Sequence, residues 1–238
     1  MTNDIQQNYH TFQEVIAQIT RNYGRKPEGI QLVVVTKGQP VEKIARVIEA
    51  GATVLGENYP EETTAKIPFL ANRQIKWHMI GHLQSRKIKF IVDDFTMIHS
   101  IDREEIAVKL NERLAAANKT MRALFEVNLS GEEAKSGFAA WDENRWDELV
   151  DDLLRMTQFS NLHFTGLMTM PPYAEKPEDS RQVFIKCRRL LERFQIRSGD
   201  KNFIDLSMGT SLDYAVAIQE GATFLRIGQA IMGERTYR

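Results

Sequence analysis

The stretch LVVVTKGQP, residues 32–40, has the pattern of a strand that is buried on both faces. Its four successive apolar residues, Leu32–Val35, are typical of parallel strands covered by helices. Glycine and proline then end the strand, and residues 41–51 follow with helical spacing. The pattern therefore predicts a strand and then a helix, and it places an amine, Lys37, at the carboxyl end of the strand.

The same unit recurs along the chain. Apolar runs alternate with longer amphipathic stretches, and the runs cover residues 31–35, 53–56, 77–81, 97–100, 122–128, 162–170, 204–209 and 223–228. This rhythm predicts a protein of the α/β class, a single (β/α)8 TIM barrel, with a doubly wound open sheet as the alternative. Helical spacing from Ile5 to Tyr23 predicts an extra N-terminal helix. No Pro-rich or Gly/Ser-rich linker interrupts the chain, so we expect one domain over residues 1–238.

The composition limits the possible partners. Lys and Arg number 31 against 32 Asp and Glu, so no overall basic field indicates binding to nucleic acid or to a membrane. The single cysteine, Cys187, lies in a helical pattern and is interpreted as a packing thiol. The N-terminal residues lack the layout of a signal peptide, and no stretch is as apolar and long as a membrane span. We therefore expect a cytoplasmic protein.

Polar side chains follow most of the predicted strands, and the carboxyl ends of barrel strands form the mouth where active sites lie. Lys37 is the first of them. Partial desolvation at the mouth disfavours an ammonium and favours the neutral amine that forms a Schiff base, although a lysine stem covering the rim is the plainer interpretation. His78 and His82 are separated by a strand end and a glycine, so no metal site is predicted.

Two loops near the C-terminus have the features of a phosphate site: LSMGTS (206–211) and RIGQAIMG (226–233). They follow the predicted seventh and eighth strands, the usual phosphate position in barrels. Gly209 and Gly228 let backbone N–H groups approach an anion closely, although turns and a helix cap explain such loops equally well. Hydroxyl groups in the first loop come from Ser207, Thr210 and Ser211.

An amine opposite a phosphate cradle indicates a phosphorylated aldehyde held covalently. Pyridoxal 5'-phosphate (PLP) is the leading candidate, and an aldolase that forms a Schiff base with a sugar phosphate is an alternative.

The sequence also resembles the pyridoxal phosphate homeostasis protein family, whose fold is similar to the N-terminal barrel of alanine racemase. The matching stretches run in order from residue 32 to the C-terminus, and they are VVVTKGQP, LGENYPEE, WHMIGHLQSRK, IHSID, EVNLSGEEAKSGF, GLMTMPP and LSMGTSLDYAVAIQEGATFLRIGQAIMGER. Three features depart from the usual family pattern: Gln229 replaces a small hydroxyl residue, Arg86 replaces an asparagine, and Gly38 and Gln39 stand at variable positions.

The resemblance implies a covalent aldimine between PLP and Lys37, with Arg226 near the pyridine nitrogen. It implies a phosphate held by Ser207, Gly228 and Gln229. The remaining residues that it implies as pocket lining are Asn58, His82, Met208, Gly209 and Ser211.

The expected function is to hold PLP reversibly and to buffer or deliver it, without turnover. A guanidinium stays protonated and donates hydrogen bonds without giving up its proton, so Arg226 would leave the ring a weak electron sink. The expected partners are PLP and apo forms of PLP-dependent enzymes, and the expected state is a monomer. The alternative is an amino-acid racemase using Lys37 as a base, with Tyr59 as a candidate for the second face. Lys135 is a second amine at the mouth, interpreted as a secondary acceptor during transfer or as a surface lysine.

Overall fold

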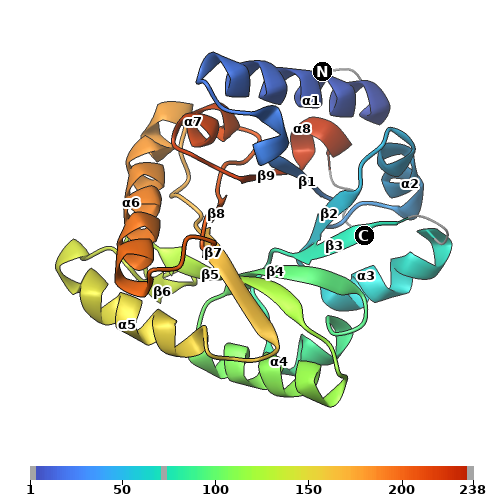
Figure 1. Ribbon diagram of the computed structural model, residues 1–238. Helices are drawn as coiled ribbons and strands as arrows, with labels where there is room; N and C mark the ends of the chain where they lie inside the picture. The colour runs from blue at the N-terminus through green and yellow to red at the C-terminus, as the bar shows by residue number, and fades with distance from the viewer. Residues whose placement is uncertain (1–3, 71–73, 235–238) are drawn as a thin grey trace.

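The computed structural model describes residues 4–70 and 74–234, in which a ring of strands is surrounded by helices (Figure 1). Eight strands pair in the order β4-β3-β2-β1-β9-β8-β7-β5, and pairing of β4 with β5 closes the ring. Their bounds are β1 (Gln31–Val35), β2 (Val54–Glu57), β3 (Lys76–Met79), β4 (Phe95–Ile101), β5 (Met121–Asn128), β7 (Leu162–Met168), β8 (Asp205–Ser207) and β9 (Phe224–Ile227). A short strand, β6 (Phe138–Ala139), pairs with the end of β5. All pairings are parallel, and the ring is closed by the pairing of β4 with β5, so the predicted barrel is confirmed and the open sheet was wrong.

Helices follow most of the strands and cover the outside of the ring (Figure 1). They are α1 (Ile5–Asn22), α2 (Val41–Glu49), α3 (Pro60–Lys66), α4 (Glu104–Ala116), α5 (Trp146–Met156), α6 (Arg181–Ser198), α7 (Tyr214–Gln219) and α8 (Gln229–Met232). The stretch after β3, predicted as a helix, is a 3₁₀ helix at Ser85–Phe90. Ile88 and Ile91 are both buried and three residues apart, a spacing that a 3₁₀ helix places on one face.

The predicted N-terminal helix is α1, and its observed end lies one residue before the expected Tyr23. The carboxylate of Asp4 accepts a hydrogen bond from the backbone N–H of Gln6, 3.0 Å away, which caps the first turn. The buried face of α1 includes Tyr9, Phe12 and Ile16, and the helix packs against α2, α7 and α8 outside the ring. Among the described residues, no helix combines the length and apolar character needed to cross a bilayer.

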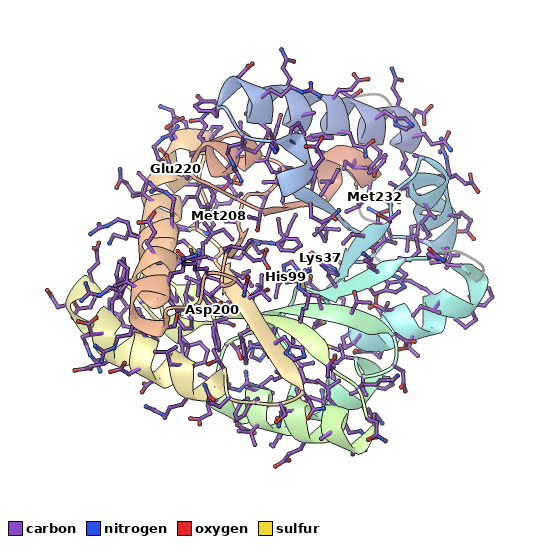
Figure 2. The ribbon with its side chains drawn as sticks, in the orientation of Figure 1. Lys37, His99, Asp200, Met208, Glu220 and Met232 are labelled. Atoms are coloured by element: carbon purple, nitrogen blue, oxygen red, sulfur yellow. The ribbon has the colours of Figure 1, made fainter. Side chains whose placement is uncertain are left out.

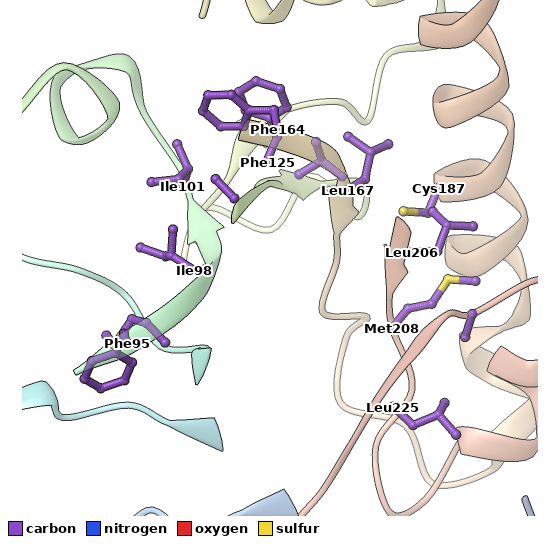
Figure 3. Packing of buried hydrophobic residues seen from close by; sticks show 14 of the residues in the cluster. Phe95, Ile98, Ile101, Phe125, Phe164, Leu167, Cys187, Leu206, Met208 and Leu225 are labelled. Atoms are coloured by element: carbon purple, nitrogen blue, oxygen red, sulfur yellow. The ribbon is translucent and has the colours of Figure 1, made fainter. Parts of the chain in front are cut away.

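The apolar core has two layers. A small cluster inside the ring takes one residue from each of six strands, namely Val33, Val54, Met97, Leu124, Met168 and Phe224. The larger cluster lies between strands and helices, where Phe125 and Phe164 stack with ring centroids 3.9 Å apart (Figure 3). Cys187 of α6 is fully buried in this layer beside Leu206, and burial raises the pKa of its thiol to about 12. Its interpretation as a packing thiol is therefore confirmed.

The inner face of the barrel changes from apolar to polar toward the mouth. Side chains alternate along a strand, so residues two apart share a face. Met97 is followed by His99, and Phe224 by Arg226, on that inner face. Buried polar groups therefore lie directly above the small apolar cluster, on the side where the carboxyl ends of the strands meet.

Candidate functional site

Lys37 lies two residues beyond the end of β1, in a turn at the mouth. The N–H of Gln39 donates to the carbonyl of Thr36 (3.1 Å), and Gly38 supports the turn with a φ of +67°. Thr36 is itself fixed, because its hydroxyl donates to the Glu57 carboxylate of β2 at 2.7 Å. Lys37 is half-buried, and it lies toward the centre of the ring in the view along the axis (Figure 2).

The loops after β2 and β3 meet beside this turn. Asn58 follows β2, and its side-chain oxygen is buried without a hydrogen-bond partner among the residues the structure describes. Gly81 makes the contact possible, since a Cβ there would lie 2.7 Å from Cγ of Asn58. An unpaired buried oxygen at the mouth is a position where a ligand donor would be favoured.

Arg226 lies on the inner face of β9, which pairs with β1 so that Val33 is opposite Arg226. The guanidinium is buried, and burial lowers its pKa to about 10, while the nearby carboxylates of Asp213 and Glu126 oppose that shift. It therefore remains protonated at neutral pH. Nη1 donates to Oγ of Ser207 at 2.6 Å, and Nη2 donates to the carbonyl of Thr169 at 3.0 Å.

Two buried histidines continue from Ser207. Nδ1 of His99 lies 2.8 Å from Oγ of Ser207, and Nε2 of His99 lies 2.9 Å from Nδ1 of His78. Burial lowers the pKa of His78 to about 3 and holds that of His99 well below its usual range. Both rings are therefore neutral. The hydroxyl of Ser207, expected at the phosphate, is engaged by Arg226 and His99.

His82 belongs to a separate, partly exposed cluster. Its Nδ1 lies 2.6 Å from Oδ2 of Asp102. The other carboxylate oxygen of Asp102, Oδ1, pairs with Nη1 of Arg103 at 2.6 Å. The described residues contain no group of three or more His, Cys, Asp or Glu arranged to hold a metal ion.

In the first of the loops expected to hold phosphate, Gly209 packs closely against α7. Gly209 has a φ of +91°, and a Cβ there would lie 2.5 Å from Cβ of Ala217. The next residue, Thr210, directs its N–H and its hydroxyl to Asp213, at 2.6 and 3.0 Å. Asp213 also occupies the N-cap position of α7, so neither Ser211 nor Thr210 caps this helix.

Ser211 and Gln229 line one cavity of about 740 Å³ beside α8. Lys43 and Arg46 of α2 lie along the same cavity and add positive charge. The structure therefore brings two of the expected phosphate residues together. Lys37 and Arg226 do not line this cavity, so it extends beside the mouth and away from the barrel axis.

Lys135 lies at the mouth in the loop between β5 and β6. Its Nζ donates to the carbonyl of Met170 at 3.0 Å and pairs with Glu132 at 3.1 Å. Because Met170 follows β7 and its sulfur contacts Arg226, Lys135 joins two loops of the rim. Tyr59 is half-exposed, with the amine of Lys87 5.9 Å from its ring centroid.

Comparison with known proteins places the chain in a family. The sequence profile described as alanine racemase, N-terminal domain, matches residues 4–236. The pyridoxal phosphate homeostasis protein of Vibrio alginolyticus is 37% identical over 238 residues, which cover 98% of each chain. The chain belongs to the pyridoxal phosphate homeostasis protein family.

Two solved structures are similar to this family member in fold. An unknown protein from Bifidobacterium adolescentis has a TM-score of 0.85 and 30% identity, with 96% of this chain and 94% of that chain covered. PipY of Synechococcus elongatus, solved with PLP bound, has a TM-score of 0.79 and 27% identity, with 92% and 100% covered.

Glu126 is a further candidate site residue, and it was not predicted from the sequence. It lies on β5, two residues after the interior Leu124, and burial raises the pKa of its carboxyl to about 7. The negative charge of Asp102 adds to this shift and Arg226 opposes it. A carboxylate after the apolar run Ala123–Phe125 was the available signal, because alternation from Leu124 places it on the inner face.

The residues present fit PLP. Lys37 supplies an amine at the mouth, and the neighbouring strand supplies a buried guanidinium. At Gly228 a Cβ would lie 3.3 Å from Cβ of Val35, so this glycine lets the loop after β9 pack closely against the end of β1. The unpaired oxygen of Asn58 adds a hydrogen-bond acceptor at the mouth.

Proposed function

We propose that this protein binds PLP reversibly as a Schiff base on Lys37 and that it buffers and delivers PLP in the cell without turnover. The supporting observation is the pairing of β1, which leads to Lys37, with β9, which carries the buried, protonated Arg226. Its relatives of nearly equal length are named as PLP homeostasis proteins.

The proposed contacts follow from the placement of the residues. Arg226 donates to the ring nitrogen, while Gly209, Ser211, Gly228 and Gln229 hold the phosphate. Met208 and Ser207 support this loop from below, where both are fully buried. Asn58 and His82 contact the ligand from the opposite loops.

Arg226 limits the reactions that bound PLP would support. Bound PLP supplies an aldehyde that condenses with amines and a ring that withdraws electrons. With a pKa of about 10, Arg226 holds its proton at neutral pH and serves as a donor. A carboxylic acid in its place would transfer a proton to the ring nitrogen and strengthen electron withdrawal, so Arg226 favours holding the ligand over transforming amino acids.

The visible absorption of the protein mixed with PLP tests the covalent link. We expect a Schiff-base band that is absent from Lys37→Ala, and borohydride reduction should attach one pyridoxyl group to the peptide containing Lys37. Lys176→Ala, which removes an exposed lysine outside the proposed contacts, is the control and should keep the band. A band of equal intensity in Lys37→Ala would refute the proposal.

Lys135 is proposed as a secondary acceptor that assists release of PLP to an apo enzyme. Its amine is held at the rim by Met170 and Glu132, within the loops that surround the site. We expect Lys135→Ala to load PLP normally and to transfer it several-fold more slowly to an apo PLP-dependent enzyme. Unchanged loading together with an unchanged transfer rate would contradict this role.

Glu126 favours one second candidate, a PLP-dependent racemase. A carboxyl with a pKa of about 7 on the inner face of the barrel has the acidity that suits proton transfer at neutral pH. Incubation of the PLP-loaded protein with L-alanine, followed by chiral chromatography, separates the two functions. D-alanine formed in dependence on Lys37 would overturn the carrier function.

A further inference from the structure

Four buried side chains from four strands form a continuous hydrogen-bonded chain inside the barrel. Arg226 of β9 contacts Ser207 of β8, Ser207 contacts His99 of β4, and His99 contacts His78 of β3. The three joining distances are 2.6, 2.8 and 2.9 Å, and the four residues are at most 5% exposed. These four side chains lie directly above the small apolar cluster, because Phe224 of that cluster packs edge-on against both imidazole rings.

The direction of this chain follows from the chemistry of its members. A guanidinium is donor-only, so Arg226 donates to Oγ of Ser207. The hydroxyl proton of Ser207 then needs an acceptor, and of the two partners that the structure gives this oxygen, His99 is the one that can accept. His99 accepts at Nδ1, so as a neutral ring it carries its proton on Nε2 and donates to Nδ1 of His78. His78 in turn carries its proton on Nε2.

Neutral imidazoles are what this arrangement requires. His99 accepts at one nitrogen and donates at the other, and an imidazolium has no acceptor to offer. Both rings are buried among cations, with Arg226 and Arg122 near His99, and Lys76 and Arg122 near His78. The positive charge therefore stays on Arg226, at the end of the chain closest to the proposed ligand.

We propose that Ser207, His99 and His78 are positioning residues that fix the guanidinium of Arg226 for the PLP ring, and that the Ser207 hydroxyl acts through Arg226 instead of on the phosphate. The inference deepens the proposed PLP site and rests on it. Three contacts hold the guanidinium, to Ser207, to the Thr169 carbonyl and to the Met170 sulfur. Arg226 has more N–H groups than these contacts use, so the remaining donors are available to a ligand while the plane of the group is fixed.

The protonation states are tested first, in the protein without ligand. Nitrogen-15 NMR of labelled histidines distinguishes the two neutral tautomers from the imidazolium. We expect His99 and His78 to be neutral at neutral pH, each with its proton on Nε2. A proton on Nδ1 of His99, or an imidazolium at either position, would contradict the proposed direction of these hydrogen bonds, whether or not the protein binds PLP.

The second test separates the ring from the phosphate by comparing PLP with pyridoxal, which lacks the phosphate group. Ser207→Ala should weaken binding of both ligands by the same factor, about tenfold, because it acts at the ring. Ser211→Ala, the matched serine of the same loop, should weaken PLP and leave pyridoxal unchanged. Loss of PLP binding with unchanged pyridoxal binding in Ser207→Ala would show that its hydroxyl serves the phosphate, contrary to the inference.

The third test asks whether His99 acts through Arg226. His99→Asn keeps an acceptor near the position of Nδ1 and should stay within about threefold of the parent in PLP affinity, whereas His99→Phe should lose about tenfold. In an Arg226→Lys background, His99→Phe should add no further loss. Additive losses, or equal losses in Asn and Phe variants with unchanged melting temperatures, would refute positioning. If the parent protein bound neither ligand, the proposed PLP site would be refuted. The NMR result would still decide the direction of the hydrogen bonds from Arg226 to His78.

Discussion

Arg226 and Glu126 carry opposite charges on the inner face of the same barrel, and burial acts on them in the same sense. Desolvation disfavours the charged form of each group, so it lowers the pKa of the guanidinium and raises that of the carboxyl. Arg226 starts from a pKa high enough to remain charged after the shift to about 10, whereas Glu126 moves to about 7. At neutral pH the site therefore has a fixed positive charge beside a carboxyl that is close to half-protonated.

The raised pKa of Glu126 predicts a pH-dependent stability. Its carboxyl titrates at about 7 in the folded protein instead of 4.5, so the stability linked to its proton is fully present below 4.5 and is lost as the pH rises through 7. We expect Glu126→Gln to match the parent near about pH 4 and to exceed it by about 2–3 kcal/mol near about pH 8 in urea unfolding. Glu133→Gln, at an exposed site, is the control and should show no such difference. Equal stability of parent and Glu126→Gln at both pH values would contradict the shift.

The loop from β8 to α7 combines a turn and a helix contact at one glycine. Gly209 has a left-handed φ of +91°, and its missing side chain leaves room for Ala217 of α7. The Asp213 carboxylate then closes the loop by accepting from Thr210. Backbone geometry and helix packing therefore both exclude a side chain at position 209. The importance of this glycine is predictable from its neighbours in LSMGTS.

Substitution of this glycine separates steric contact from backbone strain. Gly51 provides the match, because its φ is +100° and nothing lies within 4 Å of a Cβ built there. Gly51→Ala should lose stability through backbone strain alone, whereas Gly209→Ala should lose about 1–3 kcal/mol more through the contact with Ala217. Thermal and urea unfolding measure both variants. A loss at position 209 no larger than that at position 51 would show that α7 shifts freely.

Closure of the ring joins the first strand to the last. β1 pairs with β9, and α1 packs on α8, so segments from both ends of the chain build the wall beside Lys37. A ligand that contacts Lys37 and Arg226 would bridge these segments. We propose that the chain is one folding domain for this reason, and that PLP stabilises all of it.

Ligand-linked unfolding tests this proposal. PLP at about 100 times its Kd should add about 2.7 kcal/mol to the free energy of unfolding, in a single cooperative transition that moves to higher temperature. Lys37→Ala should show a much smaller shift at the same PLP concentration. Two transitions, of which PLP moves one, would show that the barrel is divided into independent units. Calorimetry with and without PLP provides the measurement.

The amino-acid sequence alone predicts the barrel, the leading helix, Lys37 at a strand end and the glycines of the phosphate loops. These features depend on local periodicity and on which residue follows a strand, and both are properties of neighbours along the chain. Contacts made in three dimensions set the partners of Ser207, the neutral state of His78 and His99, the pKa of Glu126 and the 3₁₀ helix at Ser85–Phe90. The interior contacts join strands up to 108 residues apart in sequence, and their energies depend on desolvation inside a closed ring. The alternation of residues along a strand predicts which side chains face inward, and closure of the ring decides which of them come into contact.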